Sequence, residues 1–147
     1  MSSTKNKAGN AFRAAHRKAT KFGCYDDLTQ DDVTYLFTLA GGRCAISGKF
    51  SNSLSLDHLL PLSKGGRNSI DNVIVVDLEL NCSKGNGSTL EFLRFDPHRA
   101  YDIVKLLASR SQRSYEEVYN DLVAHQSDEN NAWYRKHIQP LLDKEGA

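Results

Sequence analysis

Two short apolar runs joined by a polar, glycine-containing loop constrain the fold of this chain more than any other feature of its sequence. The first run, residues 54–56, alternates apolar and polar positions, and the second, residues 73–76, is a β-branched run typical of a buried strand. Residues 77–84 begin with an N-capping aspartate and are followed by a glycine, which is the pattern of a short helix. The order strand, loop, strand, helix predicts a small α+β unit in the middle of the chain.

Helices are predicted on both sides of this central unit. Residues 8–22 are rich in Ala, Lys and Arg and end before a glycine. Residues 29–40 open with a capping-box pattern, Thr29 with Asp32, and end before two glycines. The last third of the chain repeats apolar residues at helical spacing. We therefore divide the chain into three parts: a basic N-terminal helical arm (1–24), the central unit (25–90) and a helical C-terminal extension (91–147).

Positive charge is concentrated at the start of the chain. The net charge is only +1, but residues 1–24 hold six Lys and Arg and no Asp or Glu. Such a segment suits a phosphate backbone or an anionic membrane face, and a solvated helix face without a partner is the alternative. The cations expected to contact nucleic acid lie in this arm and beside the central unit: Arg13, Arg17, Lys18, Lys21, Lys64, Arg67 and Lys84.

The cysteines and the hydropathy pattern favour an intracellular protein. Three cysteines without a CxxC pair argue against both a disulfide framework and a self-contained zinc knuckle, so a reducing compartment fits best. The first residues lack the apolar core of a signal peptide, and no apolar run approaches the ~20 residues that span a bilayer. We expect a soluble cytoplasmic protein without a membrane partner.

Four polar side chains of the central unit are expected to converge on one cleft. Asp57 and His58 end the first predicted strand, Asn72 precedes the second, and Asn81 lies in the opening turns of the short helix. Carboxylate and amide oxygens suit Mg²⁺, and a neutral imidazole beside such an ion can take a proton from water. Asn72 can donate and accept hydrogen bonds at once, which suits a brace for the loop that follows His58.

Four stretches around these residues form a recognisable pattern: RCAISG (43–48), LDHLLPLSKGG (56–66), DNVIVV (71–76) and LNCSKGN (80–86). Together they resemble the HNH endonucleases, whose site is a β-β-α-metal (His-Me finger) unit. The resemblance covers the middle of the chain, and its third signature position is Asn rather than His. It implies that His58 is the general base, that Asp57 and Asn81 hold one Mg²⁺ or Mn²⁺ ion per active site, and that Asn72 is the structural asparagine.

The chain departs from many relatives at the positions where two CxxC pairs bind a structural zinc ion. The corresponding residues here are Cys44, Ser47, Asp77 and Leu80. One thiolate cannot complete a four-ligand zinc site, so we expect no structural zinc. Apolar packing of Leu78 and Leu80 is expected to hold the unit instead, with Cys44 and Cys82 as small buried residues.

The resemblance implies metal-dependent hydrolysis of DNA phosphodiester bonds, by nicking or by double-strand cutting. Free-standing enzymes of phages and bacteria, including homing endonucleases, have this plan of a small catalytic unit with added DNA-binding segments. A homodimer would supply two active units for a double-strand cut. Two alternatives stay open: a non-catalytic nucleic-acid-binding or packaging accessory protein, and a ribonuclease or toxin of similar fold.

Overall fold

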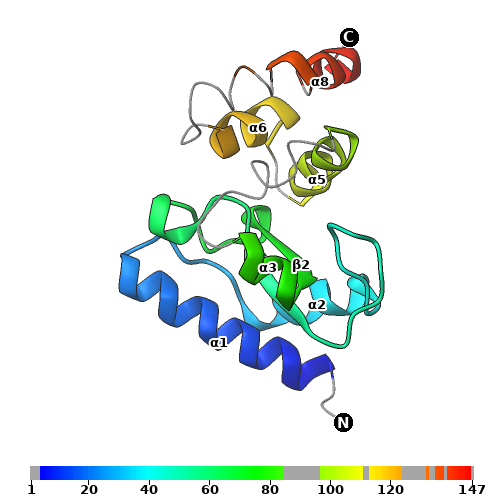
Figure 1. Ribbon diagram of the computed structural model, residues 1–147. Helices are drawn as coiled ribbons and strands as arrows, with labels where there is room; N and C mark the ends of the chain where they lie inside the picture. Colours follow the sequence, from blue (N-terminus) through cyan, green and yellow to red (C-terminus); the bar gives the residue numbers. More distant parts are fainter. Residues whose placement is uncertain are drawn as a thin grey trace.

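A computed structural model describes residues 4–84, 97–110, 113–123, 132, 135–137 and 139–146. A small antiparallel sheet lies between the N-terminal helix α1 and the C-terminal helices α5, α6 and α8 (Figure 1). The α+β class predicted from the sequence is confirmed. The elements are α1 (Thr4–Phe22), α2 (Gln30–Ala40), β1 (Leu54–His58), η1 (Leu62–Lys64), η2 (Ile70–Asn72), β2 (Val73–Asp77), α3 (Leu78–Lys84), α5 (Pro97–Ser109), α6 (Tyr115–Val123) and α8 (Gln139–Gly146).

Helix α1 packs against the rest of the protein through small residues. Ala8, Ala15 and Ala19 are buried, and their spacing of seven and then four residues places them on one face of the helix. This helix contacts α2, η1 and β1. The basic N-terminal segment is therefore a helix that packs through its alanines and exposes most of its charged side chains. No helix in the part of the chain that the structure describes is long and apolar enough to cross a membrane.

Helix α2 begins and ends as its sequence predicts. The Thr29 hydroxyl oxygen accepts a hydrogen bond from the Asp32 backbone N–H, and the Asp32 carboxylate accepts one from the Thr29 N–H, both at 3.1 Å. Gly41 ends the helix in the left-handed conformation, with a φ of 57°. The buried face of α2, Val33, Leu36 and Phe37, packs with Val73 and Val75 of the sheet.

The register of the sheet divides its residues between two apolar clusters. Strand β1 pairs with β2 from Leu54 opposite Asp77 to His58 opposite Val73. Because neighbouring residues of a strand point to opposite faces, alternate residues of β2 join different clusters. One face packs on α1 and α2, and the other packs on α5 and α6 through Ile74 and Val76.

The C-terminal helices support the sheet from the second face. Ile103, Val104 and Leu107 of α5 are buried with Val118 and Tyr119 of α6. Two arginines extend this support to polar groups of β2 and of the loop before it. The Arg110 guanidinium donates to the Val73 carbonyl oxygen at 2.8 Å, and the Arg113 guanidinium lies 3.3 Å from the Asp71 carboxylate.

The loop between β1 and β2 turns back on itself through η1 and η2. Gly65 ends η1 with a φ of 89°, and the Gly66 N–H donates to the Pro61 carbonyl oxygen at 3.0 Å. A Cβ atom at Gly66 would lie 2.0 Å from the Leu60 carbonyl oxygen. Gly65 and Gly66 therefore allow the chain to turn tightly after Leu62–Lys64.

Helix α3 follows β2 directly, and Asp77 is its N-cap. The Asp77 carboxylate accepts hydrogen bonds from the backbone N–H groups of Glu79 and Leu80, at 3.1 and 3.2 Å. These bonds and a hydroxyl hydrogen bond from Ser51 lower the pKa of Asp77 below its ordinary value, the Ser51 bond having the largest effect. Gly85 and Asn86, which belong to the sequence pattern, lie outside the described residues.

Substitution Gly66→Ala tests how closely the loop is packed. We expect it to lower the free energy of unfolding by about 1–3 kcal/mol or more, because the added methyl group meets backbone that cannot move aside. Denaturant unfolding followed by circular dichroism measures this change. Gly9→Ala is the matched control, because its Cβ would meet only the ends of the Gln30 and Arg13 side chains. Equal stability of the two variants would contradict the packing described for Gly66.

Candidate active site

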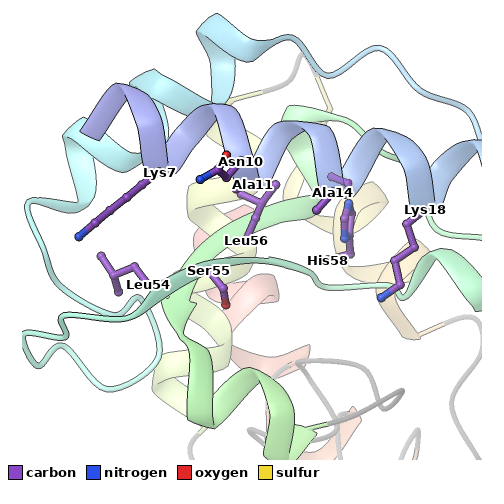
Figure 2. Close-up of a pocket in the computed structure, with 10 residues that line it drawn as sticks. Lys7, Asn10, Ala11, Ala14, Lys18, Leu54, Ser55, Leu56 and His58 are labelled. Carbon is purple, nitrogen blue, oxygen red and sulfur yellow. The ribbon is translucent and has the colours of Figure 1, made fainter. Parts of the chain in front are cut away.

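The side chains of Asp57 and His58, the last two residues of β1, point to opposite faces of the sheet, as alternation along a strand requires. His58 lies on the face covered by α1, where it lines a groove of about 430 Å³ between α1 and β1 (Figure 2). Asp57 pairs with Ile74, whose side chain belongs to the α5–α6 cluster, so the carboxylate faces the side of α3 and α5. Asp57 is 3% exposed. The His58 imidazole and the Asp57 carboxylate thus lie on the two sides of the end of β1.

The groove that contains His58 is bordered by cations and floored by small residues. Figure 2 shows Lys7 near the start of α1 and Lys18 farther along the helix, close to His58, with Ala11 and Ala14 between them. The alanines leave the space between helix and strand open, since longer side chains at these positions would fill it. The groove has the dimensions of a ligand-binding cleft and positive charge at both ends.

Asn81 contacts the same strand from α3. Its amide nitrogen donates to the Ser55 hydroxyl at 3.1 Å and, more weakly, to the Leu56 carbonyl oxygen at 3.4 Å. Ser55 is two residues before Asp57 and therefore faces the same side of the sheet. With the amide nitrogen directed at β1, the Asn81 oxygen is the atom suited to binding a cation.

The oxygen atoms of Asp57 and Asn81 fit a hard divalent cation. Within the described ranges, no group of three or more His, Cys, Asp and Glu side chains forms a metal site. Mg²⁺ does not require such a cluster, because it usually keeps several waters and takes one or two protein oxygens. His58 faces the other side of the strand, which separates it from this pair.

Asn72 holds the loop that follows β1. Its side-chain oxygen accepts from the Leu60 N–H at 2.9 Å, and its amide nitrogen donates to the Leu60 and Arg67 carbonyl oxygens at 3.0 and 2.8 Å. The side chain is buried, so these three bonds satisfy backbone groups that have little access to water. The contacts are those of a brace, and they hold the chain two residues after His58.

His58 also belongs to a hydrogen-bonded chain that the sequence did not suggest. Its Nε2 atom lies 2.8 Å from the Asn68 side-chain oxygen, and the Asn68 amide nitrogen donates to the Asp26 carboxylate at 2.9 Å. The other Asp26 oxygen lies 2.5 Å from Nδ1 of His16. No spacing rule joins residues 16, 26, 58 and 68, so only the folded chain reveals the connection.

In this chain, hydrogen bonds connect residues at the four positions where many relatives bind zinc. Burial raises the pKa of the Cys44 thiol, but hydrogen bonds from the Asp77 backbone, from Ser47 and from the Ile46 backbone outweigh it, so the pKa is lowered overall. Cys44 is buried, as expected. Leu80 packs against the α5–α6 cluster, also as expected.

Two packing predictions for α3 are wrong. Leu78 is exposed rather than packed, and Cys82 is exposed rather than buried. The reason is the shortness of the helix: one side of its seven residues meets the sheet, and Leu78 and Cys82, four residues apart, share the other side.

The predicted nucleic-acid-binding cations lie at different places. Lys64 and Arg67 are exposed on the loop, and the Arg67 guanidinium lies 4.4 Å from the centre of the Tyr25 ring. Lys18 lines the His58 groove, and so does Lys7, which the prediction did not include. Arg13, Arg17 and Lys21 are exposed on α1 outside the groove lining, and the Lys84 side chain lies outside the described residues.

Comparison with known proteins supports the family suggested by the sequence. Residues 42–84 match a family model described as HNH endonuclease, which confirms the family predicted from the sequence. No curated protein and no solved structure matches the chain. The matched residues include β1, the braced loop, β2 and α3, whereas α1, α2 and the C-terminal helices lie outside them. Residues 42–84, which carry Asp57, His58, Asn72 and Asn81, therefore form an HNH endonuclease domain.

Proposed function

We propose that this protein hydrolyses phosphodiester bonds of DNA, with His58 as the general base. An HNH domain indicates a nuclease-type function in general terms. The observation that carries the finer proposal is the position of His58 in a groove with a lysine at each end, while Asp57 and Asn81 approach the same strand from its other side.

This arrangement suits in-line displacement at phosphorus. In such a reaction the attacking water and the leaving oxygen lie on opposite sides of the phosphorus atom. A phosphodiester at the end of β1 would meet the His58 imidazole on one side, where the imidazole takes a proton from water. A divalent cation held by Asp57 and Asn81 would offset the charge that develops on the phosphate and on the leaving 3′ oxygen.

The lysines of the groove would bind the phosphates that flank the scissile phosphodiester. Lys7 and Lys18 are eleven residues apart on α1, about three helical turns, and both line the groove. Phosphates before and after the scissile bond would lie near these two cations, and their counterions would be released on binding.

One catalytic unit per chain implies that a double-strand cut requires either two copies of the protein or two successive nicks.

Substitution His58→Ala is expected to reduce cleavage of supercoiled plasmid by about 10²–10⁴-fold and to leave DNA affinity nearly unchanged, because it removes the proton acceptor. Plasmid, linear DNA and RNA should each be incubated with and without Mg²⁺ or Mn²⁺, with EDTA as the metal-free condition. His98→Ala, at an exposed position of α5, is the control. Wild-type cleavage by the His58 variant would refute the assignment, cleavage of RNA alone would identify a ribonuclease, and binding without any cleavage would identify an accessory protein.

Substitution Asn72→Ala should act through stability rather than through chemistry alone. It leaves the buried N–H and carbonyl oxygen of Leu60 and the part-buried carbonyl oxygen of Arg67 without their side-chain partner, and each buried group costs about 1–3 kcal/mol. We expect the free energy of unfolding to fall by about 2 kcal/mol or more, measured by denaturant titration. Asn52→Ala, at an exposed position before β1, is the control. An unchanged stability would contradict the brace.

The double substitution Lys7→Gln with Lys18→Gln should reduce the salt dependence of DNA binding. Each lost phosphate contact lowers the slope of log K against log salt by about 0.9, so a total reduction of roughly 1.8 is expected. The pair Lys49→Gln with Lys144→Gln removes the same charge at exposed positions outside the groove. Equal slopes for the two double variants would exclude the groove as the path of the DNA. Point substitutions are preferable to deletion of α1, because the buried alanines of this helix contribute to the fold.

A further inference from the structure

The hydrogen-bonded chain that reaches His58 begins outside the HNH domain. Asp26 lies in the segment between α1 and α2, and the matched domain starts at residue 42. The Asp26 carboxylate contacts Asn68, and Asn68 contacts His58. A residue of the N-terminal part is thus two hydrogen bonds away from the general base of the proposed function.

Asn68 is fixed in place by its backbone. Its N–H donates to the Tyr25 carbonyl oxygen at 2.8 Å, and its carbonyl oxygen accepts from the N–H groups of Asp27 and Leu28, both at 3.1 Å. The residue is 0% exposed. Its side chain therefore has few alternatives to the position between Asp26 and His58.

The acceptor character of the carboxylate decides the orientation of the Asn68 amide. An ionised carboxylate only accepts hydrogen bonds, so the amide nitrogen of Asn68 must face Asp26. The amide oxygen then faces His58, and because that oxygen also only accepts, the hydrogen of a neutral imidazole must be on Nε2. In this tautomer the lone pair is on the other ring nitrogen, Nδ1, which is therefore the ring atom that can accept a proton.

We propose that Asp26 and Asn68 are positioning residues that fix the tautomer of His58, so that Nδ1 is the atom that takes the proton from water. This inference rests on the proposed function for its catalytic consequence, but the tautomer itself is a property of the folded protein. The N-terminal part of the chain would in this way complete the active site of the HNH domain.

Substitution Asp26→Asn keeps the size and shape of the side chain at position 26 but removes its fixed acceptor character, which orients the Asn68 amide. An asparagine at this position can accept or donate, so the Asn68 amide is free to reverse and to present its nitrogen to His58. In the reversed arrangement Nε2 must accept, and the proton moves to Nδ1. Asp27→Asn is the matched control, since it removes a neighbouring carboxylate that contacts the Tyr25 hydroxyl instead. Asn68→Ala, at a fully buried position, risks unfolding and is the less informative variant.

Two measurements on the full chain test the proposal. Long-range ¹⁵N–¹H NMR spectra at about pH 8, above the ordinary histidine pKa of about 6.5, report which nitrogen of each imidazole holds the proton, and the His58 signals are identified by their loss in His58→Gln. We expect the proton on Nε2 in the wild type and in Asp27→Asn, and a measurable Nδ1–H population in Asp26→Asn. Single-turnover cleavage by Asp26→Asn should fall by about 10- to 100-fold with unchanged DNA affinity.

The outcomes are distinguishable from failure of the proposed function. A wild-type proton on Nδ1, or the same tautomer in Asp26→Asn as in the wild type, would overturn the proposal whether or not the protein cleaves DNA. A changed tautomer with an unchanged cleavage rate would overturn the catalytic role of the two residues. If the wild type cleaves no nucleic acid, the nuclease proposal fails, and the NMR comparison still decides whether Asp26 sets the tautomer.

Discussion

The pairing of β1 with β2 is the constraint on which the rest of the structure depends. A slip of this register by one residue would move every side chain of β1 to the other face of the sheet. Asp57 would then face α1, and His58 would face α3 and the α5–α6 cluster. Apolar packing prevents such a slip, because Val73 and Val75 are buried on one side and Ile74 and Val76 on the other. The chemistry of the site is therefore held in place by aliphatic side chains that take no part in it.

Local signals in the sequence predicted the elements well. The capping box of Thr29 and Asp32, the β-branched run of β2 and the N-cap Asp77 each act within a few residues, so their structural effect is already present in the sequence. The same is true of Asn72, whose contacts lie within one loop. Local signals do not show that these elements form one domain of a known family, and the HNH pattern supplied that information.

Contacts between distant segments were beyond such reasoning. The basic composition of residues 1–24 obscured the alanines that dock α1, and nothing in the spacing of Asp26 and Asn68 relates them to His58. Burial in a helix as short as α3 was equally hard to predict. Its apolar residues, Leu78 and Leu80, are too few to define a periodic face, and only the position of the sheet decides which one is covered.

Residues 42–84 are too few to enclose an apolar interior by themselves, and the two clusters show how the remainder of the chain supplies it. Helix α1 adds more than cover, because its alanines and lysines form one wall of the groove in which His58 lies. The residues that match the family are consequently fewer than the residues that form the apolar core and the groove. Grafting residues 42–84 alone onto another protein would transfer Asp57, His58, Asn72 and Asn81 but would leave behind the helical wall of the groove, so the HNH domain of this protein is not modular.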